Sequence, residues 1–218
     1  MEILQAPSPN FRTGRKGRKI IAIVNHQTAG QFPGALTWMC NPQAQASAHY
    51  LVTRQGAIYQ LVRDEDTAWH AGAVNKPNWA LYDGTNPNIV TLGIEHECYP
   101  AVGGDGNLTE AQYQATLWLH RHLMAKWGIP VDADYIIGHC RVDSVNRPNC
   151  PGSAFPWTRL FNDLKGVEVV PEWMQKIMDR SVAAGLIEAG KHNPNENATK
   201  WFVLGIGLAI LKIMGRDA

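Results

Sequence analysis

The sequence predicts an α/β domain, with a central mixed β-sheet flanked by helices, followed by a small C-terminal helical module. Two observations lead to this fold class. Short apolar runs bounded by turn residues alternate with segments of helical spacing, and the composition changes at 167–171, where a valine-rich stretch ends in proline. We therefore expect a main domain at 1–166, a linker at 167–171 and the helical module at 172–218.

Five apolar runs are expected to form strands, near residues 20–25, 48–54, 57–62, 90–97 and 134–138. The break at Gln55-Gly56 separates the second run from the third and predicts a hairpin. The segment 70–90 is rich in Asn, Pro, Gly and Trp, and we expect it to be an ordered loop. Loops on a rigid sheet are where binding residues concentrate.

The clearest helix is predicted at 109–127, where apolar side chains recur at helical spacing. Thr109 is a suitable N-cap, and Gln112, three residues later, completes a capping box. A glycine and a proline follow the helix and end it. A second helix is expected from about Pro156 to about Lys165.

The module at 172–218 is expected to be a helical hairpin. An apolar stripe runs from Trp173 to Ile187, and a second, very apolar helix follows a turn. The uninterrupted apolar run of that second helix, Trp201–Leu211, is well short of the roughly 20 residues that a membrane span needs. Two such helices have little core of their own, so dimerisation or packing on the main domain is one expectation.

Length and composition indicate a folded chain. The 218 residues can hold one good core plus a small appendage, and 45% apolar against 18% charged residues argues against disorder. The net charge is only +1, and no basic stripe with interleaved aromatic residues is present, so nucleic-acid binding is not expected.

The first twenty residues carry five Lys or Arg side chains and lack the apolar region of a signal peptide. We therefore expect synthesis in a cytoplasm, with the four cysteines reduced.

Three residues carry the strongest indication of chemistry: His26, His139 and Cys150. His26 follows the apolar run 20–24, His139 follows a second run at 135–138, and Cys150 lies between prolines. Two imidazoles and a thiolate from separate segments can form an open zinc site, which leaves the fourth tetrahedral position for water. No short ligand pair such as CxxC or HExxH is present. A packed histidine or a buried thiol therefore stays the alternative for each of the three.

The strand expected at 90–97 carries a second indication. Strand alternation places its side chains on two faces, with Leu92, Ile94 and His96 on one and Gly93, Glu95 and Glu97 on the other. A carboxylate in mid-strand is a poor choice for a core, because burying an unpaired charge is costly. Glu95 is therefore either a functional group or part of a solvated strand face.

Six motifs occur in an order that points to a known family. They are Val24–Gly30, Ser47–Val52, Ala68–Gly72, Leu92–Glu97, Gly138–His139 and Cys150–Gly152. This ordered set resembles the type 2 N-acetylmuramoyl-L-alanine amidases, zinc enzymes of phage lysis and bacterial wall turnover that are related to the peptidoglycan recognition proteins. The resemblance covers roughly residues 8–165.

The resemblance implies hydrolysis of the amide bond between N-acetylmuramic acid and L-alanine in bacterial peptidoglycan. It implies one Zn²⁺ per chain on His26, His139 and Cys150. It also implies that Glu95 is the general base, because one branch of the family carries a glutamate here. The other branch uses a tyrosine at the position of Ala48. His70, within the third motif, is expected to contact substrate.

One departure from the family pattern concerns the loop before Cys150. Many members carry Lys or Thr two residues before this ligand, where the side chain helps to hold the oxyanion, but this chain has Pro148. Arg147 is the candidate replacement, because its long side chain can reach the site. The alternative is a loop arginine paired with Asp143 or with solvent.

Three functional hypotheses remain open. The first is the zinc amidase, acting as a phage endolysin that waits in the host cytoplasm and reaches the wall after the membrane is permeabilised. The second is a peptidoglycan-binding protein of the same fold without catalysis. The third is a thiol peptidase of the wall, with Cys150 or Cys140 as nucleophile. By similarity to small modules of other wall hydrolases, the C-terminal hairpin is expected to bind cell wall, and the chain to be a monomer or a dimer through this module.

Overall fold

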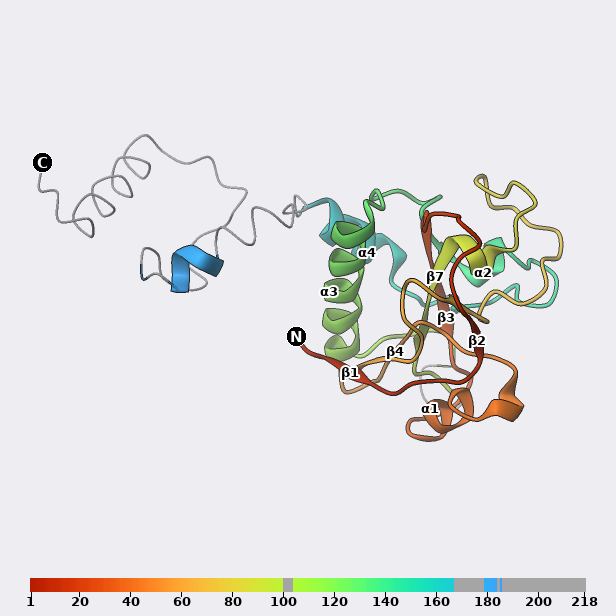
Figure 1. The fold of residues 1–218 in the computed structure, drawn as a ribbon, viewed down its shortest axis with the longest axis horizontal. Coiled ribbons are helices and arrows are strands. Elements are labelled where there is room, and N and C mark those ends of the chain that lie inside the picture. Colours follow the sequence, from red (N-terminus) through yellow and green to blue (C-terminus); the bar gives the residue numbers. More distant parts are fainter. Residues whose placement is uncertain (100–103, 167–178, 184, 186–218) are drawn as a thin grey trace, which may run out of the picture. The chain divides into compact units, whose positions relative to one another are not determined.

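The computed structural model describes residues 1–99, 104–166, 179–183 and 185. The chain divides into two compact units, Met1–Val167 and Glu168–Ala218. The predicted helical hairpin, with its apolar segments Trp173–Ile187 and Trp201–Leu211, lies almost wholly outside the described residues. Within the described residues, no helix is long and apolar enough to cross a membrane. The fold of the first unit is shown in Figure 1.

A six-stranded mixed sheet forms the centre of this unit and confirms the predicted fold class. Its strands lie in the order β1 (Ile3–Gln5), β5 (Ile58–Gln60), β4 (Tyr50–Val52), β7 (Thr91–His96), β3 (Ala22–Gln27) and β8 (Ile136–Gly138). Neighbouring strands are parallel except β4 and β5, which form the predicted hairpin. A separate antiparallel pair joins β2 (Phe11–Arg12) to β6 (Thr67–Ala68).

The two central strands, β3 and β7, are buried along almost their whole length. Such strands appear in the sequence as continuous apolar runs, because layers cover both faces of a parallel sheet. The register of this pair aligns Ala22 with Thr91 and His26 with Glu95. Each run thus ends in polar residues at the same edge of the sheet.

One face of the sheet is covered by α3 (Glu110–Trp127) and α4 (Trp157–Lys165), which lie together on one side of the strands in Figure 1. Both helices were predicted, the first of them from its spacing. Leu119 and Leu123 of α3 and Leu160 of α4 belong to the same apolar core as Ile23 of β3 and Ile94 of β7. This core fixes the helices to the two strands that carry His26 and Glu95.

The start of α3 differs in one detail from the prediction. Thr109 caps the helix as expected, with its hydroxyl oxygen accepting a hydrogen bond from the Gln112 N–H at 3.1 Å. The capping box is not completed, because the Gln112 side-chain oxygen accepts no hydrogen bond from the described residues. The amide nitrogen donates to the carbonyls of Val52 at 3.0 Å and Glu97 at 3.1 Å. Gln112 therefore fastens α3 to the ends of β4 and β7.

The opposite face is covered by α2 (Pro87–Val90) and the loops around it. Ala22, Val24 and Ile137 of the sheet share a second apolar core with Trp79 and Ile89. The prediction of an unbroken loop at 70–90 is wrong at its end, because the Asn86 side chain caps this short helix and Pro87 occupies its first turn. A helix of four residues is too short to have a periodic sequence pattern.

Three further short elements lie in the described part of the first unit. Helix α1 (Gly34–Met39), which the sequence pattern did not predict, packs Leu36 and Met39 beside Leu51 of β4 in a third apolar core. Short 3₁₀ helices lie at Pro42–Ala44 and His139–Arg141. The second of these begins directly after β8, so the strand delivers His139 to the same edge of the sheet as His26.

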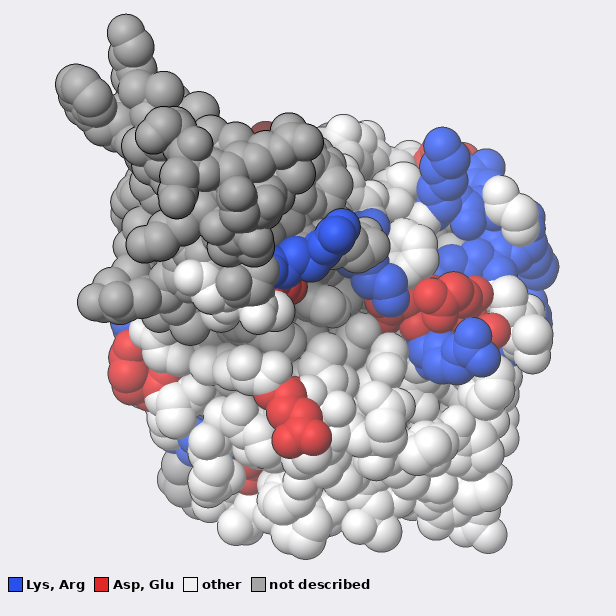
Figure 2. Space-filling view, turned by 60° about the vertical axis from the view of Figure 1, so that its left-hand side comes forward, with Lys and Arg blue, Asp and Glu red and all other residues white. Residues whose placement is uncertain are grey.

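Charged side chains are of mixed sign on the face shown in Figure 2. Lys and Arg gather at one end of this face with acidic residues between them, and much of the remaining described surface is uncharged. One ion-pair group joins Lys126 to Asp64 at 2.8 Å and to Glu65 at 3.7 Å. None of the four cysteines, all of which lie in described segments, is in a disulfide.

Candidate active site

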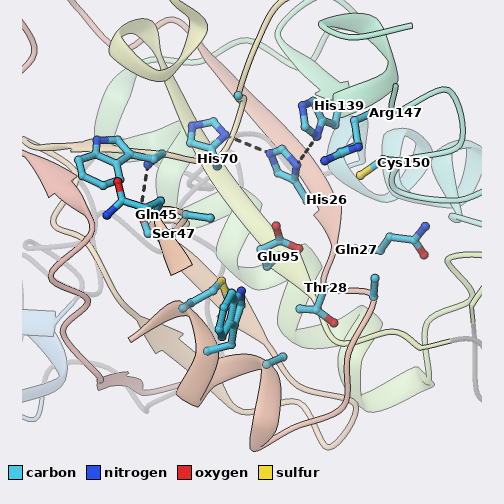
Figure 3. Close-up of a pocket in the computed structure, with 17 residues that line it drawn as sticks. His26, Gln27, Thr28, Gln45, Ser47, His70, Glu95, His139, Arg147 and Cys150 are labelled. Atoms are coloured by element: carbon cyan, nitrogen blue, oxygen red, sulfur yellow. Dashed lines mark hydrogen bonds between the residues drawn. The ribbon is translucent and has the colours of Figure 1, made fainter. Parts of the chain in front are cut away.

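A cavity of about 530 Å³ lies at the carboxyl ends of β3 and β7. Strand ends and the loops that follow them line it, as expected for a site on a parallel sheet. All six residues that the sequence singled out are among its lining residues: His26, His70, Glu95, His139, Arg147 and Cys150. Figure 3 shows these side chains around one space.

His26 and His139 form the centre of the site. Their Nδ1 atoms are 3.0 Å apart, and both side chains are buried. The His139 Nε2 atom lies 3.2 Å from the Ala71 carbonyl oxygen, and the His26 Nε2 atom lies 3.0 Å from Nδ1 of His70. A carbonyl oxygen only accepts, so Nε2 of His139 carries the proton and its Nδ1 carries a lone pair.

Burial keeps both imidazoles neutral. Desolvation, with a smaller contribution from His139, holds the pKa of His26 well below its usual value, and desolvation also lowers the pKa of His139. With His26 also protonated at Nε2, two nitrogen lone pairs face each other across 3.0 Å. This contact is repulsive unless a cation lies between the rings, so the pair is suited to metal binding.

Cys150 supplies the third donor atom. The ligand atoms of His26, His139 and Cys150 all lie within 4.8 Å of one another. Backbone hydrogen bonds fix the cysteine on its loop: its N–H donates to the Arg147 carbonyl at 3.1 Å, and its carbonyl accepts from the Cys140 N–H at 3.0 Å. Cys140, the neighbour that could compete as a ligand, is not part of this three-residue group.

The protonation state of Cys150 distinguishes a metal ligand from an activated nucleophile. Burial, followed by the nearby Glu95 carboxylate, raises the pKa of Cys150 to about 12, so the side chain is a thiol at neutral pH. Activated cysteine nucleophiles have the opposite property, a lowered pKa. A divalent metal removes such a proton when it binds. Two imidazole nitrogens and one sulfur, from three separate elements, form a donor set that fits zinc with an open fourth position.

Glu95 extends from β7 into the same cavity. Its Oε2 atom is shielded from solvent and has no hydrogen-bond partner among the described residues. Burial raises the pKa of Glu95 to about 8, and the positive charge of Arg147 opposes this rise. The carboxyl group is therefore free to take or give a proton near neutral pH, which is the property that a general acid or base needs. It is not part of a solvated strand face.

Arg147 is an exposed residue that lines the cavity, and Figure 3 shows its side chain beside His139 and Cys150. Its guanidinium donates to the Asn146 carbonyl at 3.0 Å. The alternative pairing with Asp143 is not found: that carboxylate accepts from the N–H groups of Val145 and Asn146 at 3.2 and 2.8 Å. The guanidinium thus remains available to the cavity.

His70 lines the cavity but has both ring nitrogens engaged. Nδ1 contacts His26, and Nε2 lies 3.3 Å from the Thr91 hydroxyl. Two other buried histidines, His49 and His96, make contacts that stabilise the fold. The His49 Nδ1 atom accepts from the Gly93 N–H at 2.9 Å, and His96 packs its ring against Phe155 on the opposite face of β7.

Two features of the site were missed at the sequence level. One is the aromatic part of the cavity wall, to which Trp38 and Trp69 contribute. Trp38 is 55% exposed despite its size. The other is the close packing of Gly93 against His70, because a Cβ at residue 93 would lie 2.3 Å from the His70 Cγ. Both depend on contacts between distant segments, which no local pattern reports.

The fold and the site together define an α/β protein with an open, three-ligand candidate metal centre above the carboxyl ends of its central strands. The family model described as N-acetylmuramoyl-L-alanine amidase (Amidase_2) matches residues 16–153. The chain belongs to this family, which confirms the resemblance drawn from the ordered motifs.

Two curated relatives illustrate the similarity. The chain is 29% identical over 178 residues to N-acetylmuramoyl-L-alanine amidase A of Achromobacter lyticus, covering 74% of this chain and 91% of the relative. It is 32% identical over 178 residues to the 1,6-anhydro-N-acetylmuramyl-L-alanine amidase AmpD of Salmonella typhimurium (strain SL1344), covering 73% and 88%.

Solved structures give the same fold. A crystal structure of an AmpD selenomethionine derivative matches with a TM-score of 0.60 and 27% identity, covering 75% of this chain and 94% of that one. A mutant endolysin from Bacillus subtilis matches with a TM-score of 0.57 and 23% identity, covering 75% and 99%. A complex of the amidase AmiD from E. coli with anhydro-N-acetylmuramic acid-L-Ala-D-gamma-Glu-L-Lys matches with a TM-score of 0.56 and 22% identity, covering 94% and 92%.

Proposed function

We propose that this protein is a zinc-dependent amidase that hydrolyses the bond between N-acetylmuramic acid and L-alanine in bacterial peptidoglycan. The observation that carries the proposal is the cavity in which two inward Nδ1 atoms and the Cys150 sulfur face a buried carboxyl group. Membership of the amidase family and the similarity to AmpD support the choice of substrate.

In this proposal the metal is held by Nδ1 of His26, Nδ1 of His139 and Sγ of Cys150. When bound, zinc would supply a Lewis acid that acidifies water and polarises a carbonyl group. The chain supplies the hydrogen-bond acceptors that hold both imidazoles in the required tautomer.

Glu95 acts as the general base. Its carboxylate accepts a proton from the attacking water while the new C–O bond forms at the lactyl carbonyl carbon. The carboxylic acid then returns the proton to the nitrogen of L-alanine as the C–N bond breaks, so the products are a free lactyl carboxylate and a free amine. The raised pKa of Glu95 suits both steps, because the group is an effective acid after it has acted as a base.

Arg147 stabilises negative charge on the carbonyl oxygen during attack. A positive charge beside that oxygen stabilises the charge that develops there in the transition state. Pro148, at the position where many relatives carry Lys or Thr, has no donor, whereas the Arg147 side chain lines the cavity.

The two alternative functions have weaker support. A thiol peptidase needs a thiolate, but burial raises the pKa of Cys150 to about 12 and also raises the pKa of Cys140. A protein that only binds peptidoglycan has no need for a carboxyl group such as that of Glu95, which holds a shielded, unpartnered oxygen beside a set of metal donors.

The test combines metal analysis with a product assay on purified cell walls. We expect one zinc per chain, release of new amino groups on L-alanine, and no new reducing sugar ends. A chelator should abolish the release and added Zn²⁺ should restore it. Turnover that survives chelation but is lost on thiol alkylation would instead establish the peptidase.

The role in host lysis stays a prediction. It is tested by expressing the full chain in bacteria with and without a membrane-permeabilising protein. Lysis is expected only when both are present, and a Glu95→Gln chain serves as the control for damage that does not depend on catalysis.

A further inference from the structure

A directed series of hydrogen bonds begins at His26 and continues through His70. It passes from the His26 Nε2 atom to Nδ1 of His70 at 3.0 Å, from the His70 Nε2 atom to the Thr91 hydroxyl at 3.3 Å, and from that hydroxyl to the Pro87 carbonyl at 2.7 Å. His70 and Thr91 are both buried. The first link, between His26 and His70, is visible in Figure 3.

The Pro87 carbonyl determines which atom donates and which accepts in each of these hydrogen bonds. A carbonyl oxygen accepts only, so the Thr91 hydroxyl donates to it and must itself accept from Nε2 of His70. Neutral His70 then has a lone pair at Nδ1, which accepts the proton on Nε2 of His26. The Nδ1 atom of His26 is thereby left with a lone pair directed at His139.

Contacts with Asn88 and Gly93 hold the His70 backbone and ring in place. The side-chain oxygen of Asn88 accepts from the N–H groups of His70 and Ala71, at 3.1 and 2.7 Å. The ring lies against Gly93 so closely that a Cβ there would be 2.3 Å from the His70 Cγ and 2.6 Å from its Nδ1. Ala71, in turn, supplies the carbonyl that accepts from His139. One segment, held by Asn88, therefore serves both imidazoles.

We infer that His70 is a positioning residue for the metal centre: it fixes the tautomer and ring orientation of His26 so that Nδ1 is presented to the metal. The inference rests on the proposed function in that the metal is taken to be zinc. It replaces the expectation that His70 contacts substrate, because neither ring nitrogen has a proton or lone pair left for a substrate group.

The test measures zinc affinity of the full chain by competition with a chromophoric chelator. His70→Phe keeps the ring shape and removes both nitrogens, and we expect zinc to bind about 10- to 100-fold more weakly. His70→Asn places an amide oxygen near the former Nδ1, so it should recover much of that loss. His122→Phe, on the exposed face of α3, is the matched control and should bind zinc as the unaltered chain does.

A second pair of variants keeps the inference testable if His70→Phe does not fold. Thr91→Val removes only the hydroxyl that orients His70, and it should weaken zinc binding and change the visible spectrum of the Co²⁺-substituted protein. Thr116→Val is its control, since the Thr116 hydroxyl is buried without a partner and lies on α3. A purely structural role for His70 would lower the melting temperature and leave zinc affinity and the Co²⁺ spectrum unchanged.

The outcomes separate this inference from the proposed function. Unchanged zinc affinity in folded His70→Phe and in Thr91→Val, with wall cleavage by the unaltered chain intact, overturns the role of His70 alone. Weakened affinity in both variants, in a chain that binds zinc but releases no amine from walls, supports His70 and overturns the proposed reaction. An unaltered chain that binds no zinc overturns both.

Discussion

Glu95 lies directly opposite His26 in the parallel pairing of β7 with β3. Opposed residues of neighbouring strands direct their side chains to the same face, so one register places the candidate base beside the first candidate ligand. A slip of one residue would turn every side chain of β7 to the other face. The apolar residues of the two strands, such as Ile23 and Leu92, hold this register by packing under α3.

The ligand set can be tested by removing one donor at a time. His26→Ala, His139→Ala and Cys150→Ala should each abolish zinc content and amidase activity, because a three-ligand site loses most of its affinity with one donor. Metal content is measured on the purified chains after dialysis. Cys140→Ala is the matched control and should keep both properties. Full zinc occupancy in any of the three variants would show that the missing residue is not a ligand.

Replacing the base should separate chemistry from metal binding. Glu95→Gln should fold and keep its zinc but lose at least about 10²-fold in kcat, as expected when a general base is removed. Glu97→Gln is the comparison, since the Glu97 carboxylate accepts from the N–H groups of Phe32 and Arg54 at 2.9 and 2.7 Å and holds loops together. That variant should lower the melting temperature with less effect on kcat. Near-normal turnover of zinc-loaded Glu95→Gln would refute the assigned role.

Arg147 has two measurable effects if it acts as proposed. Arg147→Ala should reduce kcat by about 10²-fold, comparable to the loss of one oxyanion donor, and Arg147→Lys should recover part of it. The pH profile should also move. Arg147 lowers the pKa of Glu95, so its removal raises that pKa and shifts the acid limb of the kcat/KM profile to higher pH. An unshifted limb together with unchanged kcat would assign Arg147 to the loop alone.

Stability should fall in acid because of histidines in the core. Burial lowers the pKa of His120 to about 4, below its ordinary value of 6.5, so the unfolded chain binds more protons between these two values. Stability is therefore fully present above pH 6.5 and is lost as pH falls toward 4. The loss for this one group is roughly 2 kcal/mol between pH 7 and pH 5. Urea titrations at several pH values should show a shallower dependence for His120→Leu, whereas equal slopes would contradict this origin.

The sequence predicts the part of the candidate site that lies at the ends of strands. His26, Glu95 and His139 each follow or end an apolar run, and parallel strands bring such ends to one edge. Arg147 is a candidate because Pro148 lacks a donor, and the structure places the arginine side chain in the cavity wall. The ordered motifs made Cys150 the third candidate ligand, although its loop has no periodic pattern, and the structure brings its sulfur to the two histidines.

Contacts between distant segments could not be predicted. The hydrogen bond from His26 to His70 spans 44 residues, and the need for glycine at position 93 arises only because the His70 ring packs there. Gln112 fits a local capping rule, but its side-chain nitrogen donates to carbonyls at the ends of two strands and its side-chain oxygen does not cap the helix. Local rules fail at these positions because tertiary hydrogen bonds compete with local ones and are stronger when buried.

The role of the C-terminal region can be tested with a chain that ends at Gly166. The family match ends at 153, every candidate site residue precedes 152, and α4 completes the apolar core with Leu160 and Leu164. We therefore expect the shortened chain to fold, keep zinc and cleave a soluble muropeptide at the rate of the full chain. It should bind purified walls less tightly in a sedimentation assay at equal concentration, because the apolar stripes at Trp173–Ile187 and Trp201–Leu211 would belong to a wall-binding module.

If those stripes instead pack on the first unit, their removal exposes apolar surface and the shortened chain aggregates. Aggregation, or wall binding equal to that of the full chain, would contradict an independent binding module and indicate a structural role.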